Sequence, residues 1–150
     1  MFASCSGNRS TQDFCVLSET VDSLDEHGQN IVLTASENSD SIYLAIIQKK
    51  VTEQTQKVQV KLYNNSSRYV YTGEHFNVEY YTDDGWKKCP RKFEIVINDI
   101  GIRLYPHCSY TFDIPLIHLK LDKKFPHYRI LKEIRVDSVE RELECRFYLE

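Results

Sequence analysis

The most regular feature of the chain is an alternation of apolar and polar residues between positions 57 and 63. Val58, Val60 and Leu62 point to one side of an extended chain, and polar residues point to the other. A period of two is that of a β-strand with one buried and one solvated face. Residues 64–67, two asparagines and two serines, bond readily to their own backbone and tolerate turn geometry. We therefore expect a half-buried strand that ends at this turn.

Short apolar runs of the same kind recur along the rest of the chain, separated by turn signals. They cover residues 31–34, 43–48, 76–81, 86–88, 93–97, 102–104, 109–114, 127–134 and 142–149. Asp83-Asp84-Gly85 predicts a tight hairpin between two of them. Because strands do not alternate with helices, we expect an all-β chain. An antiparallel β-sandwich is favoured over a closed barrel, which would need more uniform strand lengths.

Size and composition fit one domain preceded by a tail. The chain has 150 residues, of which 41% are hydrophobic, enough to bury one core. Before residue 31 the composition is mixed and the period of two is absent. We expect residues 1–30 to be a truncated signal and flexible linker, and residues 31–150 to form the sandwich.

The first residues suggest a lipid anchor. Ala3-Ser4-Cys5 resembles the end of a bacterial lipoprotein signal, in which small residues precede the cysteine that receives diacylglycerol. The resemblance implies a lipid on Cys5, which is the only membrane contact we expect, and a place in the bacterial cell envelope. No acidic residue closely follows Cys5, which favours the periplasm-facing side. The alternative is a tail with a spare cysteine.

The five cysteines form no CxxC pair, so the sequence contains neither a zinc knuckle nor a thioredoxin-type redox motif. If Cys5 carries lipid, Cys15, Cys89, Cys108 and Cys145 allow three disulfide pairings, and free thiols are the alternative. Cys145 alternates with apolar neighbours, which predicts a thiol buried in the core.

Charge and motifs argue against several function classes. The formal charge of −3 comes from 19 basic and 22 acidic residues with no long block of either sign, so we expect no footprint for nucleic acid or anionic lipid. The signatures of serine hydrolases, zinc proteases and phosphate-binding loops are absent. The five histidines are scattered, and a metal site built from His107, Cys108 and Cys89 is a remote alternative. We expect no enzyme, no cofactor and no metal.

Residues 57–134 resemble bacterial immunoglobulin-like domains found in secreted and lipid-anchored proteins. The shared features, in chain order, are Asn64, Gly73, Phe76, Glu79, Gly85-Trp86, Pro90, Pro106, Ser109, Tyr128-Arg129-Ile130 and Lys132. His127 and His107-Cys108 replace glycine-bearing positions of the pattern, so these turns are expected to be built differently. The resemblance implies an immunoglobulin-like sandwich without catalytic activity.

Most of the matching residues suit a scaffold. Trp86 is expected to pack over the core as the large aromatic of its sheet. Glu79 and Arg129 form a candidate ion pair, since the arginine fork matches a carboxylate, and a solvated arrangement is the alternative.

Tyr69, Tyr71 and Tyr81 flank the predicted strand at 76–81 and form a candidate binding surface. The alternative is that they cover the edge of the sandwich with their hydroxyls in water. Ser23, Ser41 and Ser138 each stand between an aspartate and an apolar residue. These triplets resemble the O-glycosylation acceptor of one bacterial phylum, although Asp-Ser pairs are also ordinary turn residues.

The leading hypothesis is a non-catalytic, envelope-tethered binding or structural module that engages an unknown protein or glycan partner. The second is a protease-inhibitor-like immunoglobulin-fold domain, which would present a long exposed loop. Residues 117–126, basic and apolar, are the candidate for that loop. An enzyme with an assembled site is the third.

Overall fold

The computed structural model describes residues 41–48, 50–94 and 101–150. Within these ranges the chain forms nine strands and one short 3-10 helix. The alternating segment is strand β2, and Val58, Val60 and Leu62 are fully buried, as predicted. The elements are β1 (Ile42–Ile46), β2 (Lys57–Asn64), β3 (Val70–Thr72), β4 (Asn77–Thr82), β5 (Gly85–Lys88), β6 (Ile102–Leu104), β7 (Cys108–Pro115), η4 (Leu116–His118), β8 (His127–Val136) and β9 (Val139–Tyr148).

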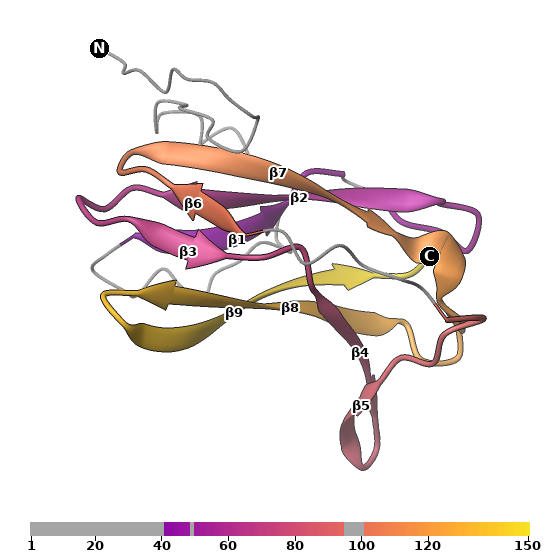
Figure 1. Cartoon of the computed structure of the whole chain (residues 1–150). Coiled ribbons are helices and arrows are strands. Elements are labelled where there is room, and N and C mark those ends of the chain that lie inside the picture. Colours follow the sequence, from indigo (N-terminus) through magenta and orange to yellow (C-terminus); the bar gives the residue numbers. More distant parts are fainter. Residues whose placement is uncertain (1–40, 49, 95–100) are drawn as a thin grey trace.

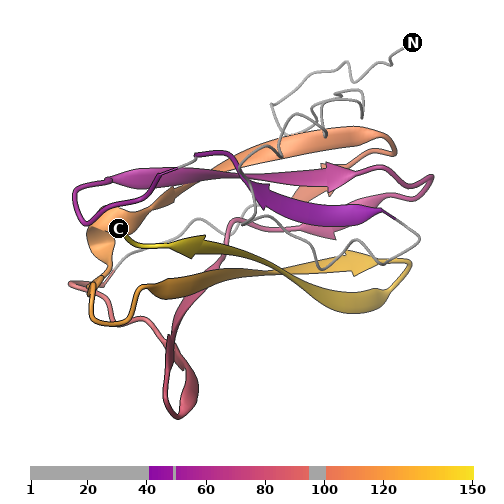
Figure 2. The same ribbon diagram turned by 180° about the vertical axis from the view of Figure 1, so that it is seen from behind.

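The strands form two antiparallel sheets that face each other (Figures 1 and 2). One sheet has the order β1-β2-β7. The other is built around β8, which pairs with β9 along one edge. Along its other edge β8 pairs first with β4 and then with β3. Strand β5 extends the sheet beyond β4, and β6 extends it beyond β3. The predicted all-β antiparallel sandwich is confirmed.

The core lies between the two sheets and is filled by the inward residues of each strand. Phe112 of β7 belongs to the same buried cluster as Ile130 of β8 and Cys145 of β9. Cys145 is 1% exposed, which confirms the buried core thiol. Cys89 and Cys108 are also buried, and Cys89 and Cys145 are free thiols. Cys5 and Cys15 lie outside the described residues.

One strand of the structure was not predicted, one predicted strand differs from the structure, and another lies outside the described residues. Strand β3 was missed because its three residues are too few to show a period. The run at 93–97 is not a strand at Phe93 and Glu94, and its remainder lies outside the described residues, as do residues 31–34. The other predicted strands are present, with ends that differ by at most three residues.

Backbone conformation explains both departures from the family pattern. His107 has a φ of 61°, the left-handed conformation that a glycine adopts without a steric penalty. His127 is the first residue of β8, so an extended residue suffices there. In the hairpin between β4 and β5, Gly85 has a φ of 107°, which fits the predicted tight turn at residues 83–85. This hairpin projects away from the two layers (Figures 1 and 2).

Two buried polar side chains tie loops to the core. Asn64 is 0% exposed and donates from Nδ2 to the carbonyls of Arg68 at 2.7 Å and Tyr105 at 3.0 Å. Lys132 is 1% exposed, and its Nζ donates to the carbonyls of Gly73 and His75. The turn expected after Asn64 is therefore fixed from inside the sandwich.

Candidate binding surface

The outward face of the six-stranded sheet carries aromatic and arginine side chains in two groups. Alternate residues of β8 from Tyr128 to Val136 are buried. Arg129 and Arg135, which lie between them in the alternation, therefore point to the other side of the sheet. Each of these two arginines belongs to one group, and the two groups lie at opposite ends of β8.

The first group is centred on Trp86 of β5. Its ring lies 4.4 Å from the Arg129 guanidinium and 5.5 Å from that of Arg146 on β9. Tyr81 of β4 packs against the same ring edge to face, with centroids 5.1 Å apart. Trp86 is half-buried and lies outside the core cluster, so the prediction that it packs over the core is wrong. Trp86 is level with Tyr81 of β4 and lies on the same, outer face, where the two guanidinium groups lie against its ring.

The pair expected between Glu79 and Arg129 is present, across the neighbouring strands β4 and β8. Arg129 donates from Nε and Nη2 to one Glu79 oxygen, at 2.8 and 2.6 Å. Its Nη1 lies 3.2 Å from Glu144 on β9, which also pairs with Arg146. Arg129 and Glu79 side chains are each 23% exposed, so solvent screens this network only in part. The network holds both guanidinium groups beside Trp86.

The second group surrounds Tyr69 and Tyr71, which are 43% and 40% exposed. The Arg103 guanidinium of β6 lies 5.6 Å from the Tyr69 ring and 5.0 Å from the Tyr105 ring. Tyr71 of β3 lies 5.9 Å from the guanidinium of Arg135, its partner on β8. Exposed tyrosines and arginines thus alternate across three strands.

The structure does not bring all three candidate tyrosines together. Tyr71 is level with Arg135 on β8, whereas Tyr80, the neighbour of Tyr81, is level with Tyr128. At about 3.3 Å per residue, these two levels are roughly 23 Å apart along the strand. Tyr81 is 48% exposed but belongs with Trp86. The candidate surface is therefore one sheet face with two aromatic groups.

Sequence reasoning missed the arginines that complete both groups. Arg103, Arg135 and Arg146 each occupy an outward position of a strand next to an aromatic residue of another strand. Their alternation with buried neighbours was visible in the sequence. The sequence does not show which strands are neighbours, and it is the pairing of the strands that creates these contacts.

The other candidate residues have no common site. Ser138 is exposed in the β8–β9 turn, Ser41 is half-buried, and Ser23 and Cys5 lie outside the described residues. Glycosylation of these serines stays a prediction. Among residues 41–48, 50–94 and 101–150, no three His, Cys, Asp or Glu side chains gather closely enough to hold a metal ion.

Residues 117–126 do not form the long free loop that an inhibitor would present. They begin in η4, and the backbone is held at several points. Lys92 N donates to His118 O, Lys120 N to Pro90 O, and Leu149 N to Pro126 O. Residues 117–126 therefore lack the long free loop that would favour the protease-inhibitor hypothesis.

A family model described as a bacterial Ig-like domain matches residues 38–146. No curated protein matches the chain. In the part of the chain that the structure describes, no helix is long and apolar enough to cross a membrane.

Proposed function

The chain belongs to the bacterial Ig-like domain family, and from this premise we propose that it is a non-catalytic module that binds a protein partner through the outward face of its six-stranded sheet. Family membership supports a structural or binding role. The finer proposal depends on the residues of the sheet face, because tyrosine, tryptophan and arginine are the side chains most enriched at the energetic centres of protein interfaces.

The observation that carries the proposal is the arrangement around Trp86. Two arginines lie against its ring, and Glu79 and Glu144 hold those arginines in place. Side chains already fixed before binding lose less conformational freedom when a partner arrives. Because the rest of the face is broad and carries mixed charge, it suits a folded protein surface better than a single glycan chain.

The test is recovery of a partner from native envelope extract with the purified chain as bait. Replacing Trp86 and Tyr71 by alanine should abolish recovery and leave the thermal unfolding temperature nearly unchanged. Gln59→Ala, on the outer face of the other sheet, is the matched control and should recover the partner as the wild type does. Equal recovery by all three proteins would contradict the proposal, and recovery of material that resists proteinase would identify a glycan instead.

We also propose that a lipid on Cys5 tethers this module at the bacterial envelope. The support is the Ala3-Ser4-Cys5 triplet and the polar stretch that follows it. Cell fractionation of the Cys5→Ser variant is the test, with Cys15→Ser as the matched control. The first variant should leave the membrane fraction and the second should stay in it. An unchanged distribution of Cys5→Ser would exclude the anchor.

A further inference from the structure

Two segments that are distant in sequence lie side by side at one end of the sandwich. The Cys89 thiol donates to the carbonyl of Lys120 at 3.7 Å, and Lys120 N donates to Pro90 O at 2.9 Å. Arg91 forms an isolated antiparallel bridge with Leu119. The chain after β5 therefore runs antiparallel to the chain after η4.

This pairing concentrates positive charge. Seven exposed basic residues lie on the two segments and their continuations, namely Lys87, Lys88, Arg91, Lys92, Lys120, Lys123 and Lys124. None of them forms an ion pair with another residue in the part of the chain that the structure describes. Asp122 lies among them, and its Oδ1 accepts a hydrogen bond from the backbone of Lys124 at 2.9 Å. We call these seven residues the basic end.

The basic end was not visible in the sequence. From the formal charge of −3 and the absence of a long basic block we expected no electrostatic footprint for nucleic acid or anionic lipid, and that expectation stays a prediction. Folding brings two short basic stretches together, and a cluster of like charges raises the local concentration of an oppositely charged partner.

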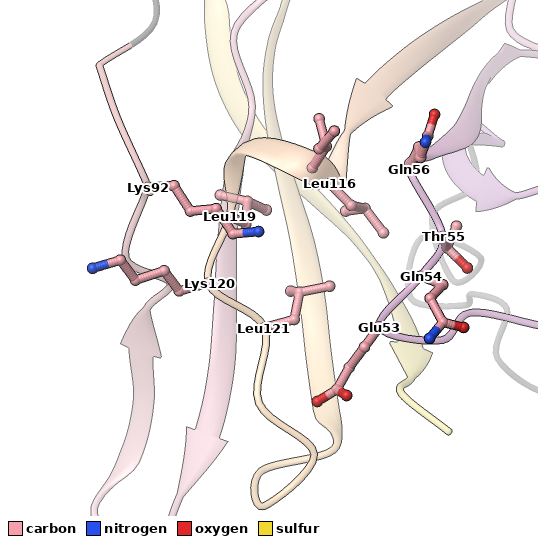
Figure 3. Close-up of a pocket in the computed structure, with 10 residues that line it drawn as sticks. Glu53, Gln54, Thr55, Gln56, Lys92, Leu116, Leu119, Lys120 and Leu121 are labelled. Carbon is pink, nitrogen blue, oxygen red and sulfur yellow. The ribbon is translucent and has the colours of Figure 1, made fainter.

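A groove of about 430 Å³ lies beside this charge, between residues 53–56 and the segment after η4 (Figure 3). Leu116 and Leu119 are buried at its floor, Leu121 is half-buried, and Ile117 is 48% exposed. In Figure 3, Lys92 and Lys120 lie on one side of the leucines, with the Lys92 ammonium directed toward them and the Lys120 ammonium directed away. Glu53 and the polar side chains of residues 54–56 lie on the other side. The groove thus has an apolar floor, a cationic wall and a wall rich in hydrogen-bonding groups.

A second hollow of about 230 Å³ continues the groove. It shares Lys120 and Leu121 with the first and is otherwise lined by Tyr80, Phe125 and Tyr128, with their neighbours. The Tyr80 and Phe125 rings lie 5.4 Å apart. Lys120 is the basic residue that the two hollows share, and Asp122 adds a carboxylate to the lining of the second.

We propose that this groove binds an extended acidic segment of a protein partner, with carboxylates on the lysine wall and an apolar side chain over the leucines. The amides of Gln54 and Gln56 can hydrogen-bond the backbone of such a segment. A concave groove does not fit the flat surface of a bilayer.

The test is fluorescence anisotropy of a fluorescein-labelled peptide, Glu-Glu-Leu-Glu-Glu, titrated with the full chain. Binding should be saturable and should weaken several-fold between about 0.05 M and about 0.3 M sodium chloride, because salt at about 0.15 M screens exposed charges beyond about 8 Å. Replacing the leucine of the peptide by glutamine should weaken binding further.

Charge reversal locates the site. Lys92→Glu and Lys120→Glu should each weaken binding about threefold to tenfold, and the double variant should weaken it more. Arg68→Glu changes the formal charge by the same amount in the loop between β2 and β3. That loop follows Asn64, at the end of β2 opposite to Lys57 and the groove. Arg68→Glu should bind as the wild type does.

Three results would overturn the proposal. They are absence of peptide binding, an equal loss in Lys92→Glu and Arg68→Glu, and binding that is indifferent to the leucine of the peptide. Capture of the chain by phosphatidylglycerol vesicles without peptide binding would assign the basic end to a membrane surface instead. The site lies apart from Trp86 and Tyr71, so its failure would leave the proposed function standing.

Discussion

At the scale of single residues, Lys132 is the side chain with the most unusual surroundings. It is 1% exposed, and its ammonium lies 4.3 Å from the Phe76 ring and 4.5 Å from the Phe112 ring. Removal from water lowers the pKa of Lys132 to about 8, and the nearby charges of Glu74 and Glu133 act in the opposite direction. The ammonium thus links the loop between β3 and β4 to both sheets at an electrostatic cost.

That cost predicts a pH dependence of stability. Between about pH 8 and the ordinary lysine pKa of about 10.5, the unfolded chain binds more protons at this position than the folded one, so the free energy of unfolding rises with pH. The difference in unfolding free energy, wild type minus Lys132→Met, should rise by about 2 kcal/mol from about pH 7 to about pH 9.5. Urea denaturation at several pH values measures it.

Other groups that titrate in this range are common to both proteins and cancel in the difference. Lys124→Met, at an exposed position, is the matched control and should show no such trend against the wild type. A flat difference for Lys132→Met would show that the Lys132 ammonium is solvated in the folded state.

Sequence reasoning at this scale succeeded where the cause is local. The turn chemistry after Asn64 and the alternation around Cys145 both depend on near neighbours, and both predictions hold. The bond from Asn64 to the Tyr105 carbonyl, 41 residues away, depends on the fold. The prediction for Trp86 was wrong for the same reason, because the arginines that hold its ring come from two other strands.

At the scale of elements, the hairpins show how local conformation sets register. Asp137 and Ser138 form the two-residue turn between β8 and β9, with Val136 level with Val139. Their φ angles are 53° and 67°, as in a type I′ turn, whose twist matches that of the strands. L-residues with side chains are strained in this conformation, and asparagine and glycine are the preferred pair.

Relief of that strain should stabilise the protein. Ser138→Gly should raise the free energy of unfolding by about 0.5–1 kcal/mol, because glycine adopts a positive φ without a clash and this gain exceeds its larger loss of freedom on folding. Thermal and urea unfolding measure the change.

The matched control is Ser67→Gly, in an exposed bend where φ is not positive. It should leave stability unchanged or lower it. A fall in stability for Ser138→Gly as large as that for Ser67→Gly would show that the turn is not strained.

At the scale of the whole molecule, the order of the strands was the part that sequence could not supply. The period of two identifies strands but not their neighbours. The pairing of β8 with three other strands separates Tyr71 from Tyr81 and gathers the arginines on one face. The basic end likewise forms only when folding brings together two segments that are about thirty residues apart in sequence.

A continuous core predicts how the thiols react. Burial raises the pKa of Cys89 to about 11 and raises the pKa of Cys145 well above its usual range. The thiolate is the reactive form, so iodoacetamide at about pH 7.5 should leave Cys89, Cys108 and Cys145 unmodified in the native protein. Cys89 and Cys145 should react in denaturant without prior reduction. Peptide mass spectrometry locates the label, and rapid native labelling of Cys145 would show that the core opens.

The projecting β4–β5 hairpin has a consequence for how copies of the protein behave when crowded. A sheet with an open edge can template the addition of a strand from another molecule. Here the edge beyond β4 is a strand of only four residues with two exposed lysines, Lys87 and Lys88, and it bends out of the plane of the layers. Short, charged and twisted edges disfavour such pairing. The hairpin therefore protects this side of the sheet against aggregation.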